Sequence, residues 1–326
     1  MIWLIIFLLL GFILLIKGAD LLVDGSSSIA KKYKISNLVI GLTIVAFGTS
    51  APELLISAIA SFGGNSGISL GNIIGSNISN TLLILGVISI ISPIVISEST
   101  VNKEIPFSFL AILALGFLVN DFLLNGGGES ILTRGDGLIL LLFFIIFIYY
   151  TFGLSKKSRG ILDDLGKDEL EEIHEHKTWI SYSMILGGLA LLFLGGEWIV
   201  SSASDLAYTL GLSQSLIGLS VVALGTSLPE LAASITAARR GKANMAVGNI
   251  IGSNIFNLLW VLGFSSIIRP IVYKSFLNID ILILAAVTIF LLFLIYMGKK
   301  NILTKREGII LLFLYFFYIT YLIIRG

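Results

Sequence analysis

Apolar residues run along this chain in long stretches that short polar segments separate. Ten of these stretches are long enough to cross a membrane as helices, with ends that the pattern fixes only to within several residues. They cover roughly 2–23, 37–60, 70–92, 105–120, 137–153, 179–203, 214–238, 244–266, 277–297 and 307–324. The pattern therefore predicts an all-α integral membrane protein with ten transmembrane helices.

Composition agrees with a membrane protein and narrows its chemistry. Hydrophobic residues make up 56% of the chain and charged residues 13%. Cysteine is absent, and the two histidines, His174 and His176, lie in a charged segment where we expect them to be solvated. Any metal in the apolar part must then have oxygen ligands, which suit Na⁺, Ca²⁺ or Mg²⁺. No basic cluster with interleaved aromatic residues indicates nucleic acid, and neither a bound cofactor nor an obligate protein partner is expected.

Two blocks of sequence occur twice, both at an offset of 177 residues. Gly41–Leu54 returns as Gly218–Leu231, and Gly71–Asn80 returns as Gly248–Asn257 with one difference in ten positions. A repeat that contains five helices places its second copy upside down in the membrane. The chain is therefore expected to form two inverted five-helix repeats.

The polar segment between the repeats sets the predicted domains and orientation. Residues 1–154 form the first repeat, 155–177 a cytoplasmic linker loop, and 178–326 the second, inverted repeat. Sixteen of the 21 lysines and arginines fall in loops on the linker's side of the membrane, which the positive-inside rule assigns to the cytoplasm. Both termini are expected outside the cell membrane, and the apolar run 2–23 is interpreted as a helix and not a cleaved signal peptide.

A proline interrupts the second apolar stretch directly before an acidic residue. Pro52 has no N–H group and should break the helix there, so that backbone carbonyls become available close to Glu53. The repeat block places the same arrangement in helix 7. The candidate cation ligands are the Glu53 and Glu230 carboxylates, the hydroxyls of Thr49, Ser50, Thr226 and Ser227, and the carbonyls of Ala46, Thr49, Ala223 and Thr226.

The second block adds neutral ligands and tight packing. Gly71 and Gly75 have the spacing of a helix-packing motif, which should bring helix 3 against helix 2. Further oxygen ligands are expected from residues four apart on one face of the helix, namely Ser76 and Asn80 in the first copy and Ser253 and Asn257 in the second. Helices 2, 3, 7 and 8 are expected to be broken around this central ion site.

Charge counting indicates an ion transporter. Apart from Lys17, near the end of the first span, no predicted span holds a basic residue near its centre that could neutralise Glu53 or Glu230. One Ca²⁺ or two Na⁺ would neutralise both, and a third Na⁺ would make the exchange electrogenic. An intramembrane hydrolase is disfavoured because no serine and histidine meet within the spans. The inverted repeat disfavours a channel, so we predict a transporter and not an enzyme.

The doubled Gly-Thr-Ser-x-Pro-Glu and Gly-Asn-Ile-Ile-Gly-Ser-Asn blocks resemble the α-repeats of the cation/Ca²⁺ antiporter superfamily. The whole chain is similar to its prokaryotic sodium/calcium exchangers. The resemblance implies exchange of Na⁺ for Ca²⁺, with Glu53, Glu230 and the carbonyls of Thr49 and Thr226 at the Ca²⁺ position. It also implies that the first helix of each repeat slides to alternate access. The Na⁺ positions would use Ser50, Ser227, Ser76, Ser253 and the carbonyls of Ala46 and Ala223.

One departure from the family pattern bears on the coupled ion. Some relatives carry aspartate where this chain has Asn257, and here Asn80 is also an amide. K⁺ dependence is therefore disfavoured, and the charge count stays at two. Exchange of Ca²⁺ for H⁺ remains an alternative, although the serine-rich ligand set favours Na⁺. Asp20 and Glu197, which correspond across the repeat, are left with either an interfacial or a gating role.

Overall fold

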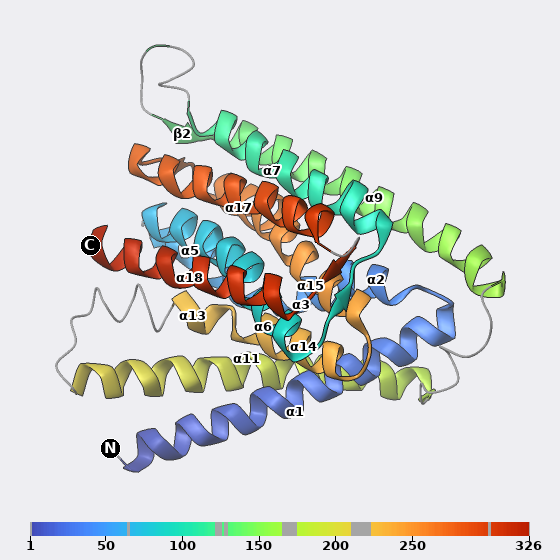
Figure 1. The fold of residues 1–326 in the computed structure, drawn as a ribbon. Helices are drawn as coiled ribbons and strands as arrows, with labels where there is room; N and C mark the ends of the chain where they lie inside the picture. The colour runs from blue at the N-terminus through green and yellow to red at the C-terminus, as the bar shows by residue number, and fades with distance from the viewer. Residues whose placement is uncertain are drawn as a thin grey trace.

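The structure is a computed structural model that describes residues 2–63, 66–120, 126, 130–164, 175–209, 223–298 and 301–325. Helices account for most of these residues (Figure 1). The first half contains α1 (Ile2–Tyr33), α2 (Asn37–Ile40), η1 (Gly41–Val45), α3 (Ala46–Thr49), α4 (Ala51–Gly63), α5 (Ser66–Ser79), η2 (Asn80–Ile84), α6 (Leu85–Ile91), η3 (Thr100–Glu104), α7 (Ile105–Leu118) and α9 (Arg134–Asp164). The second half contains α11 (Thr178–Thr209), α13 (Ala223–Thr226), α14 (Leu228–Arg239), α15 (Ala243–Ile255), η5 (Phe256–Val261), α16 (Leu262–Ile268), η6 (Ser275–Leu277), α17 (Asn278–Met297) and α18 (Lys305–Arg325).

Membrane-crossing helices form the bulk of the described residues. Eight helices are long and apolar enough to cross a membrane, and the bent pair Asn37–Thr49 and Ala51–Phe62 makes a ninth. The predicted span 214–238 is described only from Ala223 onward, and linker residues 165–174, which include His174, lie outside the described residues.

Two helices continue well past their predicted ends. Helix α1 ends at Tyr33 and α9 at Asp164, whereas the apolar pattern ended near residues 23 and 153. An apolar pattern reports only the part of a helix within hydrocarbon. The polar turns beyond it satisfy their own backbone hydrogen bonds and stay helical. Helix α9 thus extends into the segment that was predicted to be a linker loop.

Helices 2 and 7 break at equivalent serines. Ser50 separates α3 from α4 with φ −82° and ψ 7°, and Ser227 separates α13 from α14 with φ −87° and ψ 3°. The predicted breaks in helices 3 and 8 are wrong, because both helices continue through the π-helical segments η2 and η5. Neither segment contains proline, so an extra residue per turn widens the helix without ending it.

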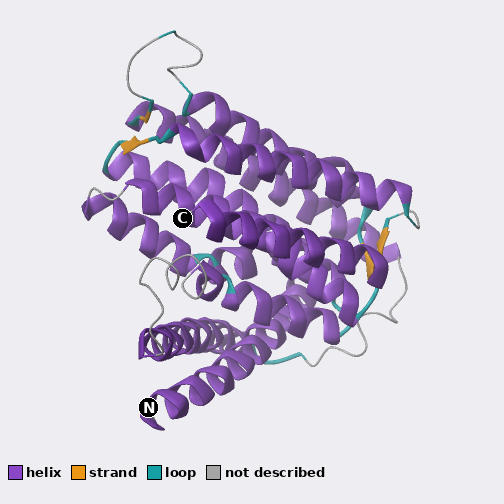
Figure 2. Ribbon diagram, turned by 60° about the vertical axis from the view of Figure 1, so that its left-hand side comes forward, coloured by secondary structure: helices purple, strands orange, loops and turns teal. Residues whose placement is uncertain are grey.

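The third and eighth spans lie at the centre of the molecule. The apolar windows of Ser69–Ile91 and Ala243–Ile268 are 78% and 83% buried. Helices α1 and α11 lie side by side at one edge of the bundle (Figures 1 and 2). Large apolar side chains such as Trp3, Tyr149 and Ile324 point outward with 71%, 81% and 81% exposure, as expected for a surface in contact with lipid.

Two short antiparallel strand pairs connect the halves. The repeat offset carries β1 onto β3, and each of these strands pairs with a strand of the opposite half. The pairs are β1 (Ile94–Val95) with β4 (Ile302–Leu303), and β2 (Ile131–Leu132) with β3 (Ile271–Val272). Each of the two central spans is therefore anchored at one end to the other half.

Glycines let α1 and α11 approach closely. A Cβ atom on Gly18 would lie 2.8 Å from the Gly188 carbonyl oxygen, and one on Gly195 would lie 2.7 Å from the Gly11 carbonyl oxygen. The offset of 177 residues carries Gly18 onto Gly195 and Gly11 onto Gly188, so the two contacts are equivalent. The backbones therefore touch without intervening side chains, which is how small residues associate helices in a membrane.

Helix 3 contacts helix 2 of the same half through α5 and α4, but Gly71 and Gly75 do not make that contact. Among the described residues, no atom lies within 4 Å of a Cβ placed on either glycine. The equivalent Gly248 instead packs against the second span of the opposite half, where its Cβ would lie 2.7 Å from the Leu38 carbonyl oxygen. Spacing identifies a glycine face on a helix, but not which helix meets it.

Paired glycine substitutions test the α1–α11 contact. In Gly188→Ala the new methyl would lie 2.7 Å from Leu22 N, so we expect unfolding free energy to fall by about 1–3 kcal/mol. In the control Gly187→Ala the methyl meets nothing within 4 Å, and the helix should gain up to about 1 kcal/mol. Thermal unfolding of the purified protein in detergent measures both, and equal melting temperatures would contradict the contact.

Candidate ion-binding site

The two glutamates begin the helices that follow the breaks. Glu53 lies in the first turn of α4 and Glu230 in the first turn of α14, and both side chains are 0% exposed. Ser50 Oγ donates a 3.2 Å hydrogen bond to Glu230 Oε1, and Ser76 Oγ donates a 3.3 Å hydrogen bond to Glu53 Oε1. The Oε2 atoms of both glutamates are buried and have no hydrogen-bond partner among the residues that the structure describes.

Asn80 and Asn257 place two neutral oxygens among the buried acceptors. Asn80 Nδ2 donates to Asn254 Oδ1 at 3.1 Å, and Asn257 Nδ2 donates to Asn77 Oδ1 at 3.0 Å. The repeat relates these two bonds to each other. The Oδ1 atoms of Asn80 and Asn257 remain buried without a partner. The amide N–H groups are therefore engaged across the two halves, while the carbonyl oxygens are available to a cation.

The remaining candidate hydroxyls are also buried. Thr49 Oγ1 donates to Asn249 Oδ1 at 3.1 Å and lies 3.5 Å from Ser253 Oγ. Ser227 Oγ is buried without a partner among the described residues, and Thr226 is 6% exposed. Of these candidates, Ser50 reaches the carboxylate of the opposite half and Ser76 that of its own half.

The backbone carbonyls are less free than the proline suggested. Ala46 O accepts the N–H of Ser50 at 3.0 Å, and Gly48 O, which is four residues before Pro52, accepts the same N–H. A carbonyl oxygen has two lone pairs, so Ala46 still has one for an ion. Of Ala223 the structure describes only the backbone, in α13.

Sequence reasoning missed three asparagines that support these ligands. Asn77 and Asn254 orient the amides of Asn257 and Asn80, and Asn249 accepts from Thr49 and donates 3.0 Å to Ser234 Oγ. All three lie in the duplicated block, where an amide side chain inside an apolar span was the available signal. Their importance depends on contacts between halves, which spacing along one helix does not reveal.

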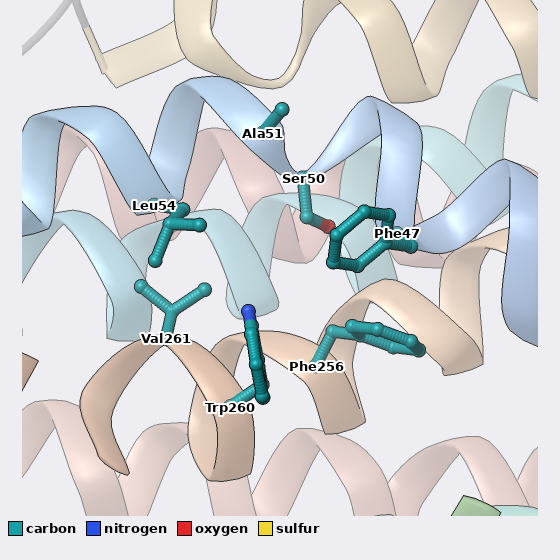
Figure 3. A pocket seen from close by; sticks show the side chains of 7 residues that line it. All are labelled: Phe47, Ser50, Ala51, Leu54, Phe256, Trp260 and Val261. Atoms are coloured by element: carbon teal, nitrogen blue, oxygen red, sulfur yellow. The ribbon is translucent and has the colours of Figure 1, made fainter. Parts of the chain in front are cut away.

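Apolar side chains cover one flank of the site. Phe47 and Leu54 extend from either side of the Ser50 break toward Phe256 and Trp260 (Figure 3). They enclose, with Ser50 at the rim, a cavity of about 20 Å³. The ring centroids of Phe47 and Phe256 lie 5.7 Å apart. This wall separates the polar interior from the surface that faces lipid.

The arrangement can hold hard cations. Among the described residues no group of three or more histidine, cysteine, aspartate or glutamate side chains could hold a metal. The formal charge of the site is therefore limited to two carboxylates, surrounded by hydroxyl and amide oxygens. Buried carboxylates without a counter-charge destabilise a membrane protein, and oxygen-only donors select ions such as Na⁺ and Ca²⁺.

Apolar membrane-crossing helices around two buried carboxylates define an ion-transporting membrane protein. The family model described as sodium/calcium exchanger protein matches residues 3–153 and 180–324. The chain belongs to this sodium/calcium exchanger family, whose members are membrane antiporters and not enzymes.

Individual relatives match along almost their full length. The sodium/calcium exchanger MaX1 of Methanosarcina acetivorans is 32% identical over 345 residues, which cover 97% of each chain. CaxA of Alkalimonas amylolytica, named as a candidate antiporter, is 40% identical over 309 residues and 94% of each chain. The solved structure of the sodium-calcium exchanger NCX_Mj without Na⁺ and Ca²⁺ is 34% identical, with a TM-score of 0.81 over 99% of this chain and 100% of that one.

Neutralising one central glutamate should abolish Ca²⁺ binding. Glu53→Gln removes one of two formal charges and is expected to weaken binding by at least about a hundredfold. The matched control is Glu104→Gln, since Glu104 is also 0% exposed but accepts hydrogen bonds from Tyr150 and Ser99. Isothermal titration of the purified protein with Ca²⁺ measures both variants. Equal affinities in the two variants would remove Glu53 from the site.

Proposed function

We propose that this protein is a secondary active antiporter that exchanges Na⁺ for Ca²⁺ across the cell membrane by alternating access. The observation that carries the proposal is a set of four buried acceptor oxygens without partners. Two belong to Glu53 and Glu230, and two to Asn80 and Asn257. A bound cation would satisfy all four and would also neutralise the two carboxylates, which a neutral donor cannot do.

The transported ions are held by the residues that line this region from both halves. Ca²⁺ takes the two carboxylates, and Na⁺ ions take hydroxyl, amide and carbonyl oxygens beside them. The proposed ligands are Glu53, Glu230, Thr49, Thr226, Ser50, Ser227, Ser76, Ser253, Asn80, Asn257, Ala46 and Ala223.

The asparagines favour Na⁺ over H⁺ as the coupled ion. An ionised aspartate at position 80 or 257 has no N–H to donate to Asn254 or Asn77. The hydrogen-bond network therefore suits amides, which neither titrate nor carry charge. With only two charged ligands, exchange of three Na⁺ for one Ca²⁺ moves one net charge across the membrane.

The proposed architecture is ten helices in two inverted five-helix halves, with both termini outside. Three observations support it. The breaks at Ser50 and Ser227 have nearly the same backbone angles. The repeat offset carries β1 onto β3, and each of these strands pairs with a strand of the opposite half. The two termini lie at the same end of the bundle in Figure 1.

The proposed moving element is the α1–α11 pair, which slides across the central helices. Polar contacts hold α1 to the connection between α14 and α15. Arg240 Nη2 lies 2.8 Å from Asp20 Oδ1, and Arg240 Nη1 lies 3.8 Å from Asp24 Oδ1. Lys242 Nζ donates to Ser27 Oγ at 2.5 Å, and burial, with Arg240 nearby, lowers the pKa of Lys242. These contacts give Asp20 a gating role at the cytoplasmic end.

Flux measurements test the coupled ion. An outward Na⁺ gradient should drive ⁴⁵Ca²⁺ into proteoliposomes, and an outward proton gradient should not. Because three Na⁺ leave for each Ca²⁺ that enters, one positive charge moves outward, so a negative potential inside the vesicle should slow Na⁺-driven uptake. Uptake that follows only the proton gradient would identify a Ca²⁺/H⁺ antiporter instead. Glu53→Gln should lack uptake under both gradients.

Thiol labelling tests the cytoplasmic contacts, since the chain has no native cysteine. Ala246, which is 0% exposed, becomes the single reporter as Ala246→Cys. Adding Arg240→Gln should raise its labelling rate by an impermeant maleimide about two- to fivefold, because a partly exposed ion pair contributes at most about 1 kcal/mol. The control Arg239→Gln makes the same charge change at the adjacent residue and should leave the labelling rate unchanged. Equal labelling rates of Ala246→Cys with and without Arg240→Gln would exclude a gate at Asp20.

A further inference from the structure

A polar seam runs between α4 and α5 from Glu53 toward the connection that joins the two helices. Along α4, Glu53, Ser57 and Ser61 follow at intervals of four residues and therefore share one face. Along α5, the opposing polar side chains are Ser76, Asn72 and Ser69. All six lie on helices that contact each other.

Two hydrogen bonds fix the register of this seam. Ser76 Oγ donates to Glu53 Oε1 at 3.3 Å, and one turn farther Asn72 Nδ2 donates to Ser57 Oγ at 3.4 Å. A step of four residues along α4 is thus matched by a step of four in the opposite direction along α5. The next step, about 6 Å farther, places Ser61 opposite the turn of α5 that contains Ser69.

The third level differs from the first two because its hydroxyls have no hydrogen-bond partner. Ser61 is 2% exposed and Ser69 is 0% exposed, and the Oγ atoms of both are unpartnered. A serine in a helix commonly bonds the carbonyl four residues before it. The Ser61 and Ser69 hydroxyls make no such bond and have no other partner among the described residues. They are therefore available to a ligand, because an unpaired buried polar group is unfavourable.

The second repeat shows that the fold does not require these hydroxyls. Asn249 Nδ2 donates to Ser234 Oγ at 3.0 Å, which reproduces the second level. At the third level the equivalent residues are Ala238 and Ala246, which are 6% and 0% exposed. The same helix pair therefore packs well with methyl groups, and the hydroxyls occur only in the half that contains Glu53.

We propose that Ser61 and Ser69, with the hydroxyl of Ser57 and the amide oxygen of Asn72, form an outer subsite for Na⁺. The inference rests on the proposed function and extends it by one position toward the outside. Neutral hydroxyl and amide oxygens suit a monovalent hard cation, whereas Ca²⁺ would meet no carboxylate at this level. The remaining ligands of the ion would be water molecules. Na⁺ that enters from outside would bind this subsite before it reaches Glu53. The second repeat has no equivalent subsite on the inward side, because Ala238 and Ala246 replace the two serines.

The double variant Ser61→Ala/Ser69→Ala tests the subsite and copies the packing that the second repeat already uses. In proteoliposomes it should raise the Na⁺ concentration for half-maximal exchange at the outer face about fivefold, as expected for two lost neutral ligands. The Ca²⁺ concentration for half-maximal exchange should not change. The matched control Ala238→Ser/Ala246→Ser should leave both outer-face concentrations as in the wild type.

Two results of the flux measurement would overturn the proposal. Unchanged Na⁺ dependence would mean that the hydroxyls hold only water, and equal shifts for Na⁺ and Ca²⁺ would mean a general distortion of the site. Binding of ²²Na⁺ to purified protein in detergent separates the subsite from transport. In a Glu53→Gln background, residual ²²Na⁺ binding should decrease with Ser61→Ala/Ser69→Ala, even if wild-type flux proved to follow protons. Identical residual binding with and without the two serines would also exclude the subsite.

Discussion

Two carboxylates without solvent exposure are the constraint on which the rest of this structure depends. Glu53 and Glu230 are each 0% exposed and each keeps one oxygen unpartnered. Ionised carboxylates are stable within a membrane only beside a counter-charge. The helix breaks at Ser50 and Ser227 place the two carboxylates in the first turns of α4 and α14, and α5 and α15 carry the candidate neutral ligands Ser76 and Ser253.

The asparagine network determines the charge of that region. Asn77 and Asn254 accept the N–H groups of Asn257 and Asn80, so the two amides that we propose as ligands present oxygen without adding charge. Neutral ligands add coordination without adding repulsion between anions. A site with two negative charges can therefore alternate between one divalent and several monovalent cations, which is the requirement for exchange between them.

The two halves are similar at the centre and different at the ends. Ser50 and Ser227 have nearly the same backbone angles, whereas Ser61 and Ser69 correspond to Ala238 and Ala246. The ion pair of Asp20 with Arg240 also lies at one end only, since the repeat equivalent of Arg240 is Gly63. A duplicated site needs such differences if its two faces are to handle ions differently.

From the residue pattern alone, the membrane class, the duplicated blocks and the residues around Glu53 and Glu230 were predictable, because hydropathy and repeat spacing are local properties of the chain. Contacts between halves decided the rest. They engage Asn77 and Asn254 with the amides of Asn257 and Asn80 and place Gly248 against the opposite half. Within the first half, the contact of α4 with α5 aligns Ser57 with Asn72. The π-helical turns in helices 3 and 8 could not be predicted from the sequence either. Neither segment contains a proline that would indicate an irregular turn, and the winding of the backbone there depends on tertiary packing.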